Sequence, residues 1–291
     1  MKVSRLLVVA SLSLSGCSYL AFLKPPSVPR ERGDTETIRG AATGVTARRT
    51  AIDPSQDWAT YNGTFEGTRS SPLAGIDQSN VGRLKPLCAF PLGEQANLQS
   101  GIVEVGGVMF VTTAVNTYAI DAATCALVWK HTYEYKPKPP FDPNMVNRGI
   151  GYLDMPGGPR VFRGANDGRV YALDARTGEE MWNVAAGDPE RGETFPAAPI
   201  AWHGLVYIGN AGGDNFGVTG RMMAFDAQDG GRVWSVALAP ENGEASTSWP
   251  RATETVPKGG AASWTSYALD TTTATVYVPT GNSAPDFLQE V

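Results

Sequence analysis

One stretch of the chain decides the fold, Tyr171-Ala-Leu-Asp-Ala-Arg-Thr-Gly-Glu-Glu-Met-Trp182. It joins an alternating apolar run to an Asp-x-x-Thr-Gly turn and to a second run that ends in tryptophan. An aspartate can accept hydrogen bonds from its own turn backbone, and a glycine adopts positive φ without strain. The pattern therefore predicts a β-hairpin with a short loop.

The same pattern occurs elsewhere in the chain, at Tyr118–Trp129 and Met223–Trp234. The three turn aspartates, at positions 121, 174 and 226, are 53 and then 52 residues apart. A partial fourth copy is predicted at Tyr267–Tyr277, where a tyrosine stands near the tryptophan position. Another strand is predicted upstream of each complete copy, at Val108–Thr112, Arg160–Phe162 and Leu205–Ile208.

A repeat of about fifty residues with several strands per unit is typical of β-propeller blades. A sandwich built from antiparallel hairpins is the alternative. It rarely repeats the same aromatic residue at a constant period, so the pattern favours an all-β propeller.

The composition agrees with a turn-rich β protein. Of 291 residues, 33 are glycine and 21 are proline, and 42% are hydrophobic, enough to form a core. The formal net charge is −5, so the basic surface that nucleic-acid binding requires is not expected. There are only two histidines, which argues against histidine-rich metal sites.

The N-terminus, MKVSRLLVVASLSLSGC, has two basic residues and an apolar run too short to span a bilayer. Leu14-Ser-Gly-Cys17 resembles a bacterial lipobox, which implies cleavage before Cys17 and lipidation of its thiol. An ordinary secretory signal with an incidental cysteine is the alternative. The predicted organisation is a signal peptide at 1–16, a lipidated tether at 17–52 and a partial propeller at 53–291, exported and anchored on the periplasm-facing membrane.

Two further cysteines, Cys88 and Cys125, remain as an even pair. In an oxidising compartment they are expected to form a disulfide. Two buried free thiols are the alternative. The sequence has no Cys-x-x-Cys-His motif, so no haem attachment is predicted in this chain.

The Asp-x-x-Thr-Gly-x-x-x-Trp repeats resemble those of the PQQ-dependent (quinoprotein) alcohol dehydrogenases, which are eight-bladed propellers. The segments Trp58-Ala-Thr-Tyr-Asn and Ile76-Asp-Gln-Ser-Asn-Val-Gly-Arg-Leu84 are also similar to that family's first blade. The resemblance implies that the repeated tryptophans pack between neighbouring blades, namely Trp129, Trp182 and Trp234. Only four to five blades fit into this length, so a C-terminally truncated member is expected.

The cofactor implied by the resemblance is pyrroloquinoline quinone (PQQ), a planar tricyclic acid. Trp264, in Gly259-Gly-Ala-Ala-Ser-Trp, matches the tryptophan that forms the floor under the quinone. Arg148, in Val146-Asn-Arg-Gly149, matches the arginine that reaches the quinone oxygens. From the residues alone, Trp264 could equally be an ordinary core aromatic and Arg148 a solvated surface residue.

The resemblance also implies a Ca²⁺ ion held by Asp214 and Asn282, whose oxygens suit a hard cation. Gly212 and Gly213 would let backbone amides approach the cofactor, and Gln99 replaces a family glutamate. Taken singly, Asp214 and Asn282 are typical turn residues. The roof formed by adjacent cysteines in methanol-oxidising members is missing, because the stretch at 141–147 contains none.

The implied activity is oxidation of an alcohol or related hydroxy compound in the periplasm, with electrons passing to a separate acceptor such as a cytochrome or a quinone. No catalytic residue is assigned, since the family's aspartate base is expected beyond Val291. The alternative is a non-catalytic propeller lipoprotein, an interaction scaffold resembling the outer-membrane barrel assembly lipoprotein. The order Arg148, Asp214, Trp264, Asn282 favours the dehydrogenase, and the missing base favours the scaffold.

Overall fold

The computed structural model describes residues 49–133, 145–213, 217–239, 244–247 and 259–284. The chain divides into two units, Met1–Glu36 and Thr37–Val291, and every described residue belongs to the second. The predicted lipidation site Cys17 and the predicted metal ligand Asp214 lie outside the described residues. The domain boundaries expected at 16 and 52 stay predictions.

The quoted repeat folds as the predicted hairpin. The Asp174 carboxylate accepts the backbone N–H of Arg176 at 2.8 Å. Gly178 closes the turn with φ of +75°, a left-handed conformation that side chains rarely adopt, and its N–H donates to the Asp174 carbonyl at 2.9 Å. These local bonds lie in the turn that joins two adjacent antiparallel strands.

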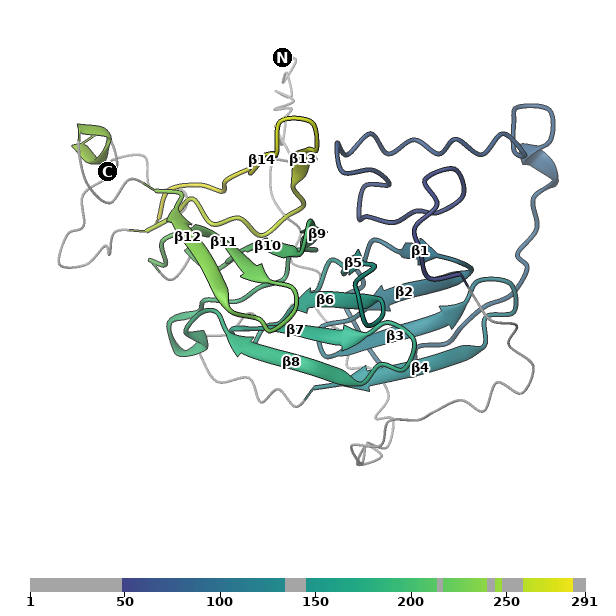
Figure 1. The fold of residues 1–291 in the computed structure, drawn as a ribbon, viewed down its shortest axis with the longest axis horizontal. Helices are drawn as coiled ribbons and strands as arrows, with labels where there is room; N and C mark the ends of the chain where they lie inside the picture. The colour runs from purple at the N-terminus through teal and green to yellow at the C-terminus, as the bar shows by residue number, and fades with distance from the viewer. Residues whose placement is uncertain (1–48, 134–144, 214–216, 240–243, 248–258, 285–291) are drawn as a thin grey trace, which may run out of the picture. The chain divides into compact units, whose positions relative to one another are not determined.

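The described strands form three four-stranded antiparallel sheets and one two-stranded sheet, each in chain order (Figure 1). The first sheet comprises β1 (Val103–Val105), β2 (Val108–Thr112), β3 (Asn116–Asp121) and β4 (Leu127–Thr132). The second comprises β5 (Gly151–Leu153), β6 (Arg160–Gly164), β7 (Arg169–Asp174) and β8 (Glu180–Ala185). The third comprises β9 (Ile200–Trp202), β10 (Leu205–Gly209), β11 (Arg221–Asp226) and β12 (Arg232–Ala237), and the fourth comprises β13 (Ala268–Asp270) and β14 (Thr275–Tyr277).

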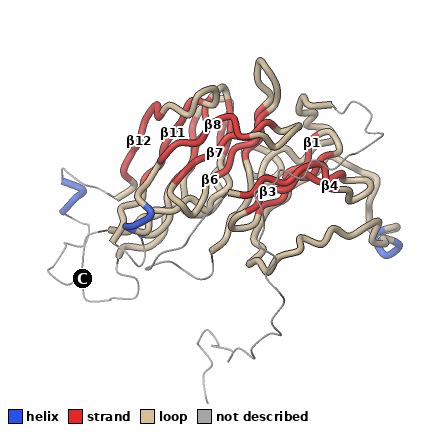
Figure 2. Tube along the Cα trace, turned by 90° about the horizontal axis from the view of Figure 1, so that it is seen from below, coloured by secondary structure: helices blue, strands red, loops and turns tan. Residues whose placement is uncertain are grey.

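Helical structure in the described residues amounts to three short 3₁₀ turns and the single helical residue Gly213, while strands supply most of the regular structure (Figure 2). These turns are η1 (Val81–Arg83), η2 (Pro189–Arg191) and η3 (Glu244–Thr247). None of the helices in the described ranges has the length and apolarity needed to cross a membrane. The predicted all-β architecture of repeated antiparallel units is confirmed.

One prediction is wrong: Tyr267–Tyr277 is not a fourth copy of the tryptophan repeat. In the complete repeats the Asp-containing turn joins the third and fourth strands of a sheet. Here the turn after Asp270 joins β13 to β14, which are the next strands after the third sheet among the described residues. They therefore correspond to the first two strands of a new sheet. The turn chemistry is the same, so local sequence could not separate the two positions.

The tryptophans pack between neighbouring sheets, as predicted. Trp129 of β4 is 1% exposed, and its indole N–H donates to the carbonyl of Ala175 in the next sheet at 3.0 Å. Trp182 of β8 makes the equivalent bond to Ala227 in the third sheet at 3.1 Å. Trp234 of β12 packs against a core cluster that reaches Leu269 in the fourth sheet. Each sheet is thus joined to the next by its last strand.

A buried arginine also joins the first two sheets. Arg163 of β6 is 1% exposed, and its guanidinium stacks over the Tyr133 ring at 4.8 Å. Its N–H groups donate hydrogen bonds to carbonyl and hydroxyl oxygens of six residues, namely Thr113, Ala114, Asn116, Thr117, Tyr133 and Gly164. Five of these six residues lie in the first-sheet region, so Arg163 pins the β2–β3 turn to the second sheet.

Candidate cofactor site

Two residues from distant parts of the sequence, Arg148 and Trp264, meet in the structure. The Arg148 guanidinium lies over the Trp264 ring at 4.7 Å from its centroid. Its Nη1 donates to the Trp264 carbonyl oxygen at 3.1 Å. Trp264 is 39% exposed as a residue, which is unusual for so large an aromatic residue and excludes its interpretation as an ordinary core residue. A cation and an accessible aromatic face therefore form one site.

The backbone of Arg148 is held from both sides by neighbouring sheets. Its N–H donates to the Pro196 carbonyl at 2.8 Å, and its carbonyl accepts the N–H of Gly101 at 2.8 Å. Gly149 follows at φ of +140°, and a Cβ there would lie 3.0 Å from the Gly101 carbonyl oxygen. Three successive parts of the chain thus run side by side at this point.

The electrostatic setting of Arg148 is that of a partly buried cation. Burial lowers the pKa of its guanidinium, and the neighbouring hydroxyl groups of Tyr61 and Tyr267 act in the opposite direction. An arginine remains protonated at neutral pH despite such a shift. The site consequently presents a permanent positive charge beside the indole, which favours an anionic ligand.

The segment that carries Trp264 is tied to two other segments by backbone bonds. The Gly260 N–H donates to the Val218 carbonyl at 2.9 Å. On its other side, the Ala261 N–H donates to the Asn282 carbonyl at 2.7 Å. Gly260 pairs with residues on both sides, in bridges to Thr219 and Ser283. The tryptophan therefore follows a backbone stretch that is fixed on two sides.

Two buried residues of the same segment, Tyr267 and Ser263, complete this support. The Tyr267 hydroxyl accepts the N–H of Gly209 at 2.8 Å and donates to the Ser263 carbonyl at 3.1 Å. Burial raises the pKa of Tyr267, so it stays neutral and donates throughout the physiological range. Ser263 is fully buried, and its N–H donates to the carbonyl of Asn210 at 2.9 Å.

The two predicted cofactor-binding glycines have a packing reason of their own. Gly212 has φ of +103°, and a Cβ there would lie 2.1 Å from the Gly192 carbonyl oxygen. At Gly213 a Cβ would lie 2.8 Å from the Val218 carbonyl oxygen. Both positions exclude a side chain because neighbouring backbone occupies the space. Their proposed approach to a cofactor remains a prediction.

The other predicted site residues, Asn282 and Gln99, are exposed. The Asn282 carbonyl accepts the N–H of Ala261, which precedes Trp264 by three residues in the sequence. Gln99 lies two residues before Gly101, whose N–H reaches Arg148. The described ranges contain no cluster of three or more histidine, cysteine, aspartate or glutamate residues that could hold a metal.

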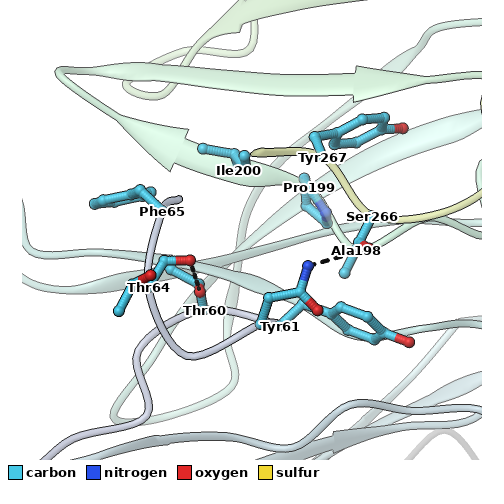
Figure 3. A pocket seen from close by; sticks show the side chains of 10 residues that line it. Thr60, Tyr61, Thr64, Phe65, Ala198, Pro199, Ile200, Ser266 and Tyr267 are labelled. Carbon is cyan, nitrogen blue, oxygen red and sulfur yellow. Dashed lines mark hydrogen bonds between the residues drawn. The ribbon is translucent and has the colours of Figure 1, made fainter. Parts of the chain in front are cut away.

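Sequence reasoning gave Tyr61 no role in the site, although it was part of the quoted Trp58-Ala-Thr-Tyr-Asn motif. Its ring would lie 2.4 Å from a Cβ at position 101, so Gly101 must be glycine for the ring to fit. Tyr61 and Tyr267 line a small pocket, which Asn62 closes by donating to the Ser266 hydroxyl at 3.2 Å (Figure 3). The pocket volume of about 10 Å³ is enough for one water and not for an organic ligand.

Residues 58–290 match the family model described as the β-propeller domain of glucose, ethanol and alcohol dehydrogenases that use PQQ. The chain belongs to this PQQ propeller family. The predicted family and fold are therefore confirmed, because the match covers most of the chain and the repeated four-stranded sheets agree with it.

Several members of the PQQ propeller family can be compared directly. The dehydrogenase subunit of the quinone alcohol dehydrogenase from Acetobacter aceti is 34% identical over 81% of this chain and 34% of its own length. A lanthanide-dependent methanol dehydrogenase from Methylacidiphilum fumariolicum is 30% identical over 79% of this chain and 40% of its own. The solved quinohemoprotein alcohol dehydrogenase ADHIIG from Pseudomonas putida HK5 superposes with a TM-score of 0.67 at 30% identity, covering 79% of this chain and 35% of that one.

This chain spans between 34% and 40% of the length of these PQQ-family relatives. The names of these three proteins describe alcohol or methanol dehydrogenases. The alternative of a non-catalytic scaffold gains no support from them.

Proposed function

We propose that this chain provides part of a PQQ site for the oxidation of an alcohol or related hydroxy compound. The single observation that carries the proposal is the contact of Arg148 with Trp264, a tryptophan that is 39% exposed. These residues are 116 positions apart in the sequence, so their contact is a property of the fold. The dehydrogenase names of the relatives support the reaction class.

The residues present fit the chemistry of this cofactor. A planar aromatic anion gains from contact with an indole face and from charge-assisted hydrogen bonds to a guanidinium. Both groups are available at one place, on backbone that is fixed by bonds to Pro196, Gly101 and Val218. When bound, PQQ would supply the two-electron acceptor for alcohol oxidation. Arg148 would hold its oxygens, and Trp264 would support its ring.

A metal ion belongs to the same proposal. Asp214 and Asn282 would donate oxygen ligands to Ca²⁺, with the cofactor supplying others. One relative is named as lanthanide-dependent, so a trivalent lanthanide is the competing metal to test. Electrons would leave to a separate acceptor such as a cytochrome or a quinone. Gln99, Gly212 and Gly213 would complete the surroundings of the cofactor.

The location proposed for this activity is the periplasm, on a membrane to which lipidated Cys17 anchors the chain. Metabolic labelling with a radioactive fatty acid tests this directly. Label is expected in the full chain and absent from Cys17→Ser. Equal labelling of the two proteins would remove the anchor from the proposal.

The cofactor proposal is tested by titrating the purified full chain with PQQ in the presence of Ca²⁺ or La³⁺ while following tryptophan fluorescence. Saturable quenching is expected, with binding weakened by about tenfold or more in Arg148→Ala and in Trp264→Ala. The matched control is Trp202→Ala, which removes a half-buried tryptophan that stacks on His203. Absence of saturable binding, or equal weakening in the control, would overturn the proposal.

A further inference from the structure

Asn147 is a buried residue next to Arg148, and its side-chain amide both donates and accepts a hydrogen bond. It is 1% exposed. Its Nδ2 donates to the carbonyl of Gly164, at the end of β6, at 2.8 Å. Its Oδ1 accepts the N–H of Gly149 at 3.0 Å. One side chain therefore connects the second sheet to the peptide that follows Arg148.

We propose that Asn147 is the positioning residue for Arg148 in the PQQ site, an inference that rests on the proposed function. The bonds to Pro196 and Gly101 fix the N–H and carbonyl of Arg148 itself. The next residue, Gly149, has the φ freedom of glycine and sits at +140°. The Asn147 amide removes that freedom. The guanidinium thereby leaves the backbone in one direction, toward Trp264.

The test compares Asn147→Ala with Asn116→Ala in the full chain. Asn116 is also buried, at 4% exposure, and its side chain bonds to Glu94 and Thr132 in the first sheet, without contacting Arg148. Asn147→Ala is expected to weaken PQQ binding about tenfold, while Asn116→Ala keeps it within about twofold of the unmodified chain. Equal binding by the two variants would overturn the positioning role.

A second readout needs no cofactor. Because the Arg148 guanidinium lies over the Trp264 ring, the ring current is expected to shift the NMR signals of the Arg148 side-chain protons. This ring-current shift is expected to be lost in Asn147→Ala and kept in Asn116→Ala, and its retention in both would overturn the inference. If the unmodified chain fails to bind PQQ, the proposed function fails, and the NMR comparison still decides the role of Asn147.

A different observation concerns the turn at Asp77, which precedes the first sheet. The Asp77 carboxylate accepts the Ser79 N–H at 2.7 Å, and its carbonyl accepts the Val81 N–H at 2.9 Å. The same two bonds, from the second and the fourth following residues, recur at the three repeat turns that begin with Asp121, Asp174 and Asp226. Residues 77–81 therefore share these two hydrogen bonds with the repeat turns, although Val81 begins the 3₁₀ turn η1 and does not have the left-handed φ of the repeat positions.

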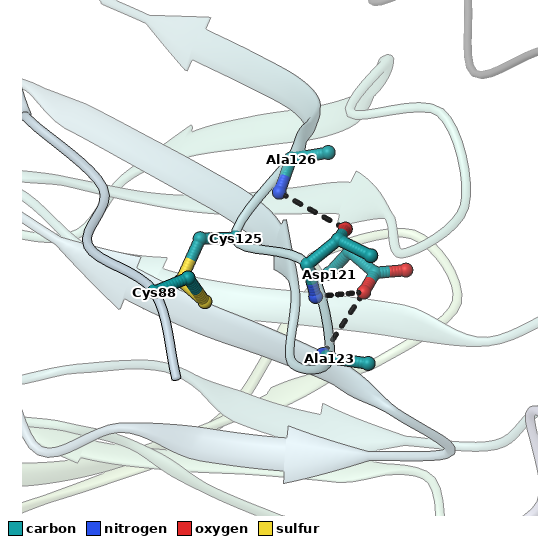
Figure 4. The surroundings of a disulfide bond; sticks show 6 residues. Cys88, Asp121, Ala123, Cys125 and Ala126 are labelled. Atoms are coloured by element: carbon teal, nitrogen blue, oxygen red, sulfur yellow. Dashed lines mark hydrogen bonds between the residues drawn. A yellow bond between two sulfur atoms is a disulfide. The ribbon is translucent and has the colours of Figure 1, made fainter. Parts of the chain in front are cut away.

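The fourth residue after the aspartate is the docking point in these repeats. Gly178 and Gly230 occupy it with left-handed φ, and a Cβ at either would lie within 2.8 Å of a tryptophan ring atom from the preceding sheet. In the first sheet the same position is Cys125, also left-handed at +56°. Its neighbour is Cys88, to which it is joined by a disulfide (Figure 4).

We infer that residues 77–92 are a further docking repeat, in which the Cys88–Cys125 disulfide replaces the tryptophan-on-glycine contact. Cys88 lies 11 residues after Asp77, three more than the eight that separate each docking tryptophan from its turn aspartate. Beyond it, Phe90 and Leu92 pack against the first-sheet cluster that contains Tyr118. A covalent bond thus takes the place of aromatic packing at the start of the array.

The test replaces the disulfide with a tryptophan-on-glycine contact. The double variant Cys88→Trp/Cys125→Gly is compared with Cys88→Ala/Cys125→Gly, which has neither contact. The tryptophan variant is expected to unfold at a higher temperature, with a Tm unaffected by reductant, whereas reductant lowers the Tm of the unmodified chain. Equal Tm values for the two double variants would overturn the inference.

Limited trypsin digestion gives an independent measure that does not depend on global unfolding. Arg83, which is exposed and followed by Leu84, is a trypsin cleavage site within the proposed repeat, whereas Lys85 is protected because Pro86 follows it. Cleavage after Arg83 is expected to be about tenfold faster in Cys88→Ala/Cys125→Gly than in the tryptophan variant, because the segment lacks a docking contact. Equal cleavage rates would contradict the assignment.

Discussion

The contact between Trp129 and Gly178 provides the sharpest test of how the sheets are joined. Substitution of Gly178 by alanine places a Cβ 2.6 Å from Cε3 and 2.7 Å from Cδ2 of the indole. The ring is 1% exposed and is held by its bond to Ala175, so it cannot turn away without losing that bond. The substitution therefore acts on the interface between the first and second sheets.

Two separate costs contribute to the expected effect. A non-glycine residue in the left-handed conformation costs roughly 1–2 kcal/mol. Overpacking a filled core position costs roughly a further 1–3 kcal/mol. Gly178→Ala is therefore expected to lower the free energy of unfolding by about 2–5 kcal/mol.

Gly204 supplies the matched control. It has φ of +77°, close to the +75° of Gly178, but a Cβ there would meet nothing within 4 Å. Gly204→Ala is expected to lose only the conformational part, about 1–2 kcal/mol, when both variants are unfolded with urea at equilibrium. If the two variants lose the same stability, the tryptophan–glycine contact does not resist displacement and the docking argument is refuted.

Three further predictions concern other described contacts. Arg163→Met removes the guanidinium donor from the carbonyl oxygens of Thr113, Ala114 and Asn116 and is expected to lower the free energy of unfolding by about 3 kcal/mol in urea. An unchanged value would contradict the role of Arg163 in joining the first two sheets. Trp182→Phe removes the indole bond to Ala227 and should cost about 1 kcal/mol by calorimetry, with no loss arguing that the bond is dispensable. Hydrogen bonds from Thr272, and secondly from Thr273, lower the pKa of Asp270 to about 2. The ionised carboxylate therefore contributes its full stabilisation of the fold above the ordinary pKa of 3.8, and this stabilisation is lost as the pH falls toward 2. An NMR titration of the Thr272→Val variant should show the Asp270 pKa moving back up, and an unmoved pKa would refute that cause.

The hairpins could be predicted from sequence because their causes are local. The Asp174 turn depends on bonds within five residues, and its glycine conformation depends on the absence of a Cβ. The same locality explains the error at Tyr267–Tyr277. The turn at Asp270 has the equivalent hydrogen bond from the second following residue. Whether such a turn joins the first two or the last two strands of a sheet depends on how the strands pair, which the local sequence does not specify.

The candidate site was predictable only in part. Arg148 and Trp264 were selected from short motifs, while the cation–ring contact between them follows from sheets that bring distant segments together. Nothing in the pattern Val146-Asn-Arg-Gly149 indicated that the Asn147 amide bonds to Gly164 and Gly149. Such bonds depend on the register of neighbouring strands, which a local motif does not specify.

The sequence by itself determined the period, the turns and the residue types available for a cofactor, because these depend on spacing and side-chain chemistry. Only the tertiary structure decided which surfaces meet. It placed Trp129 on Gly178 and Arg148 on Trp264, whereas the Cys88–Cys125 disulfide was already expected from the even number of remaining cysteines. The physical reason is that each contact joins residues from different sheets or segments, and their approach requires the intervening backbone to be paired and packed.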